Sequence, residues 1–201
     1  MKIFKYIVLL FAFAISSGYL QAQNTVLTGV DREATIEKIR LVYKDLSSLT
    51  ANFTQEKHSS MFVEPLIQKG TMSYVSPSSL CWEYTSPQHI VIQFDKGNAT
   101  MLMDGRKATP NKALGELGKL IIRTLNGDNL VTGKEFEVSY EKNGKSQVIV
   151  VLKPVNKKMR LVCTQMEVTL DAKTYLADKV VIQEASGDKT EITFTKKKVN
   201  Q

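Results

Sequence analysis

Residues 70–84, GTMSYVSPSSLCWEY, decide the fold of this chain. On each side of Pro77 every second residue is apolar and its neighbours are mostly polar. A period of two is the mark of a β-strand with one buried face, and a proline between two such runs marks a turn. The stretch therefore predicts two successive antiparallel strands that share an apolar face.

The same signal continues along the chain in both directions. Asn143-Gly144 lies between two alternating runs and is a strong hairpin signal. Short strands separated by Pro, Gly and Asp turns are typical of an antiparallel meander. Besides residues 70–84, strands are expected at 49–53, 90–94, 100–103, 135–141, 146–153, 162–170, 176–184 and 189–195.

Two segments have helical spacing instead. Ile36, Ile39 and Tyr43 recur at helical intervals after Asp31, which predicts an amphipathic helix from Asp31 to about residue 47. A second helix is predicted over 114–125, with Gly118 on its apolar side. Residues 23–30 are expected to be a flexible start. The order predicts an α+β fold: an incomplete, open antiparallel β-barrel or strongly curved sheet, with the two helices covering one opening.

The N-terminus has the pattern of an export signal. Lys2 and Lys5 precede a mainly apolar run of ten residues, and a small residue, Ala22, ends the segment. This arrangement predicts a cleaved signal peptide over residues 1–22, because the apolar run is too short to span a bilayer. Residues 23–201 are then expected to form a single domain outside the cytoplasm, in the periplasm.

Composition argues against several classes of function. Lysine and arginine number 27 against 20 acidic residues, but the basic residues are scattered, so nucleic acid binding is not expected. Neither histidine has a partner at metal-ligand spacing, and no nucleophile or phosphate-loop motif is present. We therefore expect no metal, no cofactor and no catalytic residue, and interpret the chain as a binding protein.

The two cysteines, Cys81 and Cys163, each lie in a predicted strand. In an oxidising compartment an even number of cysteines allows one disulfide. Two buried free thiols are the alternative, and the sequence does not separate the two.

Large apolar residues crowd onto one face of four successive strands. Methionine and aromatic side chains suit a site that accepts variable apolar partners, although the core of any sheet also has such a face. The residues of this face are Met72, Tyr74, Leu80, Trp82, Tyr84, Ile92, Phe94, Met101 and Met103.

The run from Leu49 to Gln55 resembles the start of the periplasmic lipoprotein carriers of the LolA type. It has the pattern apolar-x-Ala-x-Phe-x-Gln directly after the first predicted helix. The strands within residues 70–84 are similar to the Gly-x-Leu-x-aromatic and Pro-x-x-apolar-x-Trp strands of that family. Residues 184–194 look like a shorter branch of the family that accompanies exporters of acyl lipids or polyene pigments.

The resemblance implies an apolar cavity under a helical lid, which shelters acyl chains of lipoproteins and shuttles them from the inner to the outer membrane. It also implies an inner-membrane releasing complex or exporter, an outer-membrane acceptor, transient membrane contact and a monomeric carrier. Phe53 would join the apolar face above in lining the cavity. The inner face of the lid would consist of Leu114, Leu117, Ile121 and Leu125.

One departure from the family concerns the lid. Many of these carriers have an arginine directly before the strand proline, where it ties the barrel to the lid, and here that residue is Ser76. The cargo also stays open: a carrier of another acyl lipid or pigment and a non-catalytic envelope scaffold are the alternatives to a lipoprotein carrier.

Overall fold

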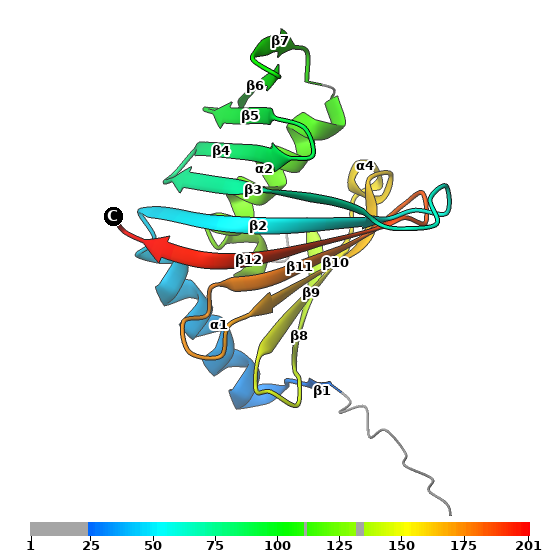
Figure 1. Ribbon diagram of the computed structural model, residues 1–201. Helices are drawn as coiled ribbons and strands as arrows, with labels where there is room; N and C mark the ends of the chain where they lie inside the picture. The colour runs from blue at the N-terminus through cyan, green and yellow to red at the C-terminus, as the bar shows by residue number, and fades with distance from the viewer. Residues whose placement is uncertain (1–23, 111, 132–134) are drawn as a thin grey trace, which may run out of the picture.

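The computed structural model describes residues 24–110, 112–131 and 135–201, which form one strongly curved sheet with helices on its inner side (Figure 1). In chain order its strands are β1 (Thr25–Val26), β2 (Ser48–His58), β3 (Leu66–Val75), β4 (Ser79–Ser86), β5 (Ile90–Asp95), β6 (Asn98–Met103), β7 (Arg106–Ala108), β8 (Phe136–Lys142), β9 (Val148–Pro154), β10 (Cys163–Leu170), β11 (Ala177–Glu184) and β12 (Lys189–Val199). The helices are α1 (Gly29–Lys44), α2 (Lys112–Leu125), α3 (Asp128–Val131) and α4 (Lys157–Arg160).

The described strands pair antiparallel in the order β1-β8-β9-β10-β11-β12-β2-β3-β4-β5-β6-β7. The outermost strands, β1 and β7, do not pair with each other, so the sheet stays open. The predicted α+β fold with an open, curved antiparallel sheet is thereby confirmed. No helix in the described part of the chain is long and apolar enough to cross a membrane.

The first helix begins and ends earlier than the sequence suggested. Thr28 is the N-cap residue, and Asp31 lies in the first turn, where its charge favours the helix dipole. The helix ends at Lys44, and residues 45–47 form the connection to β2, which is fixed to the sheet: the carbonyl of Ser47 accepts a hydrogen bond from the Ser76 amide at 2.9 Å. The Asn200 side chain also accepts one from the Ser47 amide at 2.9 Å.

The expectation of a flexible start over residues 23–30 is wrong for most of that segment. Thr25 and Val26 pair with β8, and the Leu27 amide donates to the Tyr140 carbonyl at 2.7 Å. Leu27 is buried in the core. A two-residue strand has no internal period, so only its distant partner reveals it.

Strand β2 lies near the centre of the sheet, between β12 and β3, and a glycine on β3 sets how closely the neighbouring strands pack. Phe53 on β2 lies opposite Gly70 on β3 and Phe194 on β12. A Cβ at Gly70 would lie 1.9 Å from the Glu83 carbonyl oxygen and 2.7 Å from the Phe53 ring. Only glycine leaves space for the large Phe53 ring at this crossing, which brings Phe53 against the aromatic residues of β4.

The alternation of buried and exposed residues along β3 and β4 shows which side chains form the inner face of the sheet. Met72, Tyr74, Leu80 and Trp82 are all buried, and their strand neighbours are more exposed. Helices α1 and α2 cover this face (Figure 1). The core thus lies between the concave side of the sheet and the helices, the place where a ligand space can form.

Candidate functional site: an apolar cavity under helix α2

A cavity of about 90 Å³ lies between the concave face of the sheet and helices α1 and α2. The sheet contributes residues from both halves, and α2 closes one side. Its lining residues are Tyr43, Gln55, Met72, Trp82, Tyr84, Ile92, Phe94, Gly118, Leu120, Ile121, Thr124, Leu125, Met166, Val168, Ala177, Val180, Ile182, Ile192 and Phe194.

The structure brings together half of the residues that the sequence proposed for the cavity. The proposed residues that line it are Met72, Trp82, Tyr84, Ile92 and Phe94. Phe53, Tyr74 and Leu80 are buried next to them but are not part of the lining. Met101 and Met103 are half-buried on β6, beyond the cavity.

The proposed inner face of the lid is described only in its second half. Ile121 and Leu125 of α2 line the cavity. The side chains of Leu114 and Leu117 lie outside the described part of the chain.

Sequence reasoning missed the wall of the cavity that β10, β11 and β12 form. Met166, Val180 and Phe194 face Trp82 across the concave side, and Tyr43 reaches in from α1. The alternation of β10 and β12 is visible in the sequence, but it does not say that their apolar faces turn toward β4. That information lies in the curvature of the whole sheet.

Aromatic rings on β2, β4 and β12 pack together at the wall of the cavity. The ring centroids of Phe53 and Trp82 are 4.4 Å apart, and the Tyr84 ring meets Phe53 edge-on at 5.2 Å. Phe194 meets Trp82 edge-on at 6.1 Å. The indole N–H of Trp82 is buried and has no hydrogen-bond partner among the described residues. These contacts hold rigid aromatic surface in place next to the open space.

The few polar groups at the cavity are neutral. The Tyr84 hydroxyl donates to Gln55 Oε1 at 3.1 Å, and Gln55 Nε2 donates to Gln68 Oε1 at 3.0 Å. Burial raises the pKa of the Tyr84 hydroxyl, and the neighbouring Trp82 and Gln55 side chains lower this pKa in part. Burial also raises the pKa of Tyr43 well above the usual value. None of the lining residues carries a charge at neutral pH, so the space suits a hydrocarbon chain.

Helix α2 fits against the sheet through a glycine. A Cβ at Gly118 would lie 2.0 Å from the Phe94 ring, so the helix backbone rests directly on that ring. Gly127, with a φ of 79°, ends the helix and packs on Tyr43 of α1. The helix is therefore held in contact with both the sheet and α1.

A hydrogen-bonded contact ties the end of α2 to the turn between β3 and β4. Asn126 Nδ2 donates to the Pro77 carbonyl at 3.0 Å, and Asn126 Oδ1 accepts from the Tyr74 hydroxyl. This is the place where Ser76 stands instead of the arginine that ties barrel and lid in many LolA-type carriers. Here the side chain of Asn126, at the end of the helix, makes the contact with the turn. Nothing in the sequence indicated this role for the asparagine.

Replacing Asn126 by alanine is expected to loosen α2. The change removes both hydrogen bonds and leaves the Tyr74 hydroxyl without its acceptor, at a cost of about 1–3 kcal/mol. Equilibrium unfolding measures the loss of stability, and the exchange rate of a bound apolar dye measures the loosening of α2. Tyr74→Phe, which removes one of the two bonds, should show a smaller effect in both, and wild-type dye exchange in Asn126→Ala would refute the tie.

The disulfide that the sequence allowed is not formed. Cys81 and Cys163 are both free thiols, on β4 and β10. Cys81 alternates with the inward-facing Leu80 and Trp82 and therefore lies on the opposite face of the sheet, and four strands separate β4 from β10. Burial raises the pKa of both thiols.

Comparison with known proteins adds a family to this geometry. The family model "Outer membrane lipoprotein carrier protein LolA" matches residues 44–201, whereas no curated protein matches the chain. A LolA superfamily protein of Nitrosomonas europaea is 8% identical, with a TM-score of 0.46 over 86% of this chain and 95% of its own.

Two further solved structures have a similar arrangement. A putative outer membrane lipoprotein-sorting protein domain of Vibrio parahaemolyticus is 12% identical, with a TM-score of 0.40 over 83% of this chain and 92% of its own. The lipoprotein LppX of Mycobacterium tuberculosis is 11% identical, with a TM-score of 0.43 over 84% of this chain and 96% of its own. Because the family model spans residues 44–201, well over half of the sequence, the chain belongs to the LolA family of outer membrane lipoprotein carrier proteins.

Proposed function

We propose that this protein is a non-catalytic periplasmic carrier that shelters the acyl chains of lipoproteins and shuttles them from the inner to the outer membrane. The observation that carries the proposal is the uncharged apolar cavity between the sheet and α2. In this proposal the protein works as a monomer, receives cargo from an inner-membrane complex and delivers it to an outer-membrane acceptor. Residues 1–22, which lie outside the described residues, would direct its export.

The chemistry of the lining supports a hydrocarbon cargo. Each methylene group that leaves water gains about 0.8 kcal/mol, so an acyl chain does not cross an aqueous space unaccompanied at a useful rate. Trp82, Met166 and Ile182 provide aromatic and flexible apolar surface around the open space. Methionine adapts its shape to different chains at little cost.

The size of the cavity supports a lid that moves. A volume of 90 Å³ corresponds to about three water molecules or a similar number of methylene groups, far less than one membrane acyl chain. Ile121 and Leu125 of α2 occupy the adjacent space. Loading therefore requires α2 to move away from the sheet, and its return would offset part of the binding energy and assist release.

Native mass spectrometry of the protein purified from its own cell envelope, followed by lipid extraction, tests this function. We expect a bound acylated peptide. A free lipid or pigment instead would change the cargo but keep the carrier function. A protein that is purified without a ligand and does not bind an added lipopeptide would contradict the carrier function and favour an envelope scaffold.

A further inference from the structure

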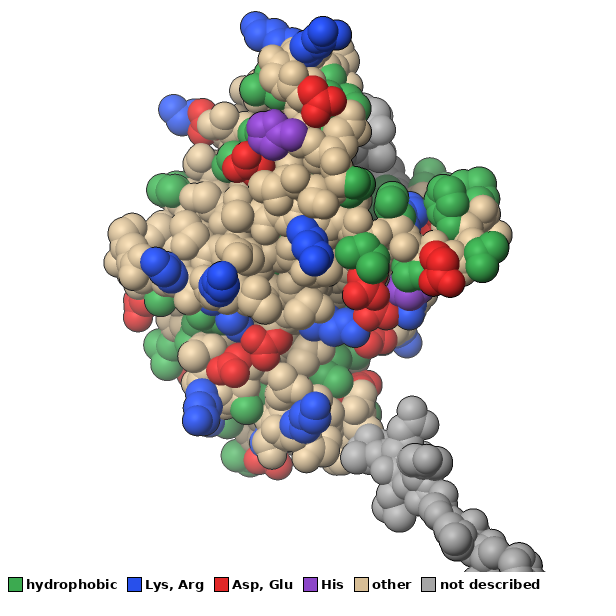
Figure 2. All heavy atoms as spheres, in the orientation of Figure 1, with side chains coloured by type: hydrophobic (Ala, Val, Ile, Leu, Met, Phe, Trp, Pro, Cys, Tyr) green, Lys and Arg blue, Asp and Glu red, His purple; other side chains and the backbone are tan. Residues whose placement is uncertain are grey.

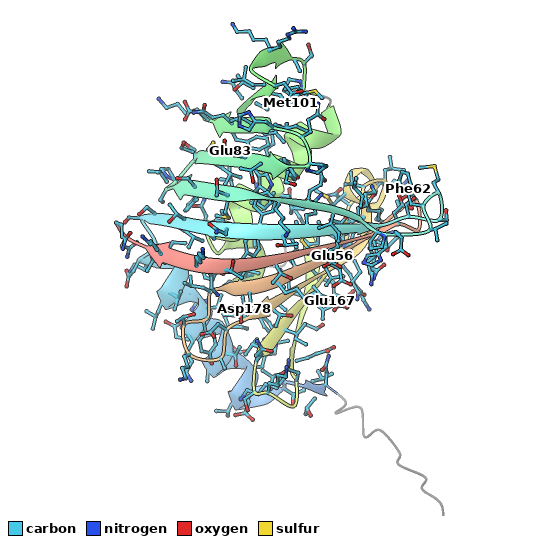
Figure 3. The ribbon with its side chains drawn as sticks, in the orientation of Figure 1. Glu56, Phe62, Glu83, Met101, Glu167 and Asp178 are labelled. Carbon is cyan, nitrogen blue, oxygen red and sulfur yellow. The ribbon has the colours of Figure 1, made fainter. Side chains whose placement is uncertain are left out.

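Three consecutive apolar side chains stand exposed at the tip of the β2–β3 hairpin. Met61 and Phe62 are 79% and 55% exposed, and Val63 is fully exposed. Figure 2 shows hydrophobic side chains gathered on this protruding tip, and Figure 3 labels Phe62 there. Single exposed apolar residues are common on protein surfaces, but a run of three at a projecting point is a feature of contact sites.

The tip is an ordered turn with a polar hollow beside it. The Phe62 amide donates to the Ser59 carbonyl at 3.1 Å, which closes the turn. Behind Phe62 and Val63 lies an open hollow of about 310 Å³, whose other wall contains His58, Ser59 and Lys189. Apolar side chains thus project beyond a shelf of hydroxyl, imidazole and ammonium groups.

The two lysines near the tip are paired, whereas the exposed Glu64, directly after Val63, has no ion pair among the described residues. Lys57 Nζ lies 3.0 Å from Glu184 and 3.6 Å from Asp188, and Lys189 Nζ lies 2.6 Å from Glu191. The tip therefore has no strong electrostatic attraction for an anionic surface. Any contact that it makes depends on its apolar side chains, and it should be insensitive to salt.

The shape of the tip favours a lipid surface over a protein partner. The exposed apolar area of three side chains is on the order of a few hundred Å², whereas a stable protein partner covers about 800 Å² on each side. A narrow projection with apolar side chains ahead of polar groups matches the profile of a membrane interface, where the acyl region lies below the headgroups.

We infer that the β2–β3 tip is a membrane contact, in which Met61, Phe62 and Val63 insert among the acyl chains of a phospholipid surface while the polar hollow meets the headgroups. This inference extends the proposed carrier function by naming the part of the protein that meets the membrane. It does not use the cavity, so the two are tested separately.

Flotation of the purified protein with vesicles of phosphatidylethanolamine and phosphatidylglycerol, at low and high salt, tests the inference. We expect binding at both salt concentrations. The triple variant Met61→Ser, Phe62→Ser, Val63→Ser should bind about tenfold less, because three inserting apolar side chains are lost.

A matched control replaces three other exposed apolar residues of β1 and α1: Val26→Ser, Val30→Ser and Leu41→Ser. It should float like the wild type, and both triple variants should unfold at the wild-type temperature because the replaced side chains are exposed. Failure of the wild type to float, or equal flotation of the tip variant, would overturn the membrane contact. Uptake of an apolar dye, measured in parallel, reports the cavity separately, so a lost tip contact with intact uptake leaves the carrier function in place.

Discussion

Trp82→Glu is expected to abolish stable folding or, where the chain still folds, to abolish uptake of acyl ligands. Trp82 is 5% exposed and packs between Phe53 and Phe194. The change removes this packing and places a carboxylate among lining residues that include no cation. Loss of a buried tryptophan alone costs about 3–5 kcal/mol, and an unpaired buried charge adds to that. Thermal unfolding should show a decrease in Tm of roughly 10 °C or more.

The pH dependence of the stability of Trp82→Glu separates the effect of the buried charge from the effect of the lost side-chain volume. Burial would raise the pKa of the new carboxyl above its unfolded value of about 4.3, so the charge destabilises the fold at neutral pH. As the pH falls below the raised pKa the carboxyl becomes neutral, and the deficit relative to wild type should shrink. Trp82→Phe is the control: it keeps an aromatic ring, removes part of the side-chain volume and adds no charge, so its loss of stability should not change with pH in this range. Wild-type stability and ligand uptake in Trp82→Glu would contradict the placement of this residue.

The sequence predicted the strands around Trp82 well because their signal is local. Alternation in β3, β4 and β5 depends on neighbouring residues along one strand, and all three strands appear where the pattern put them. Met72, Trp82 and Phe94 then share the concave face, since antiparallel pairing keeps opposite residues on the same side.

The rest of the site depends on contacts between distant segments. Phe194 meets Trp82 only because β12 lies beside β2 in a curved sheet, which no local pattern specifies. Asn126 reaches Pro77 across 49 residues, and its place at the end of a predicted helix does not reveal that partner. The sequence signal for the end of a helix is the same whether or not the last residues of that helix bind a turn of the sheet. The tie on α2 therefore became visible only with the structure.

Two glycines of the same helix allow the seating of α2 to be tested with one chemical change. Gly118→Ala places a methyl group 2.0 Å from the Phe94 ring, whereas Gly115→Ala meets nothing within 4 Å. Both changes improve helix propensity by about 0.5–1 kcal/mol, so the difference between them isolates the contact with Phe94. We expect Gly115→Ala to be slightly stabilising and Gly118→Ala to cost about 1–3 kcal/mol through overpacking.

Because Phe94 is buried in the sheet, the strain at Gly118 is most easily relieved by moving α2 outward. Gly118→Ala should then expose the cavity and raise the rate of apolar dye uptake roughly tenfold or more, by the free energy of that overpacking. The double variant Gly118→Ala, Phe94→Leu makes room for the methyl group and should recover much of the wild-type rate, which a double-mutant cycle would measure as coupling. Equal uptake by Gly118→Ala and Gly115→Ala would mean that α2 does not control access to the cavity. Faster uptake by Gly118→Ala alone would identify the helix as the element that opens.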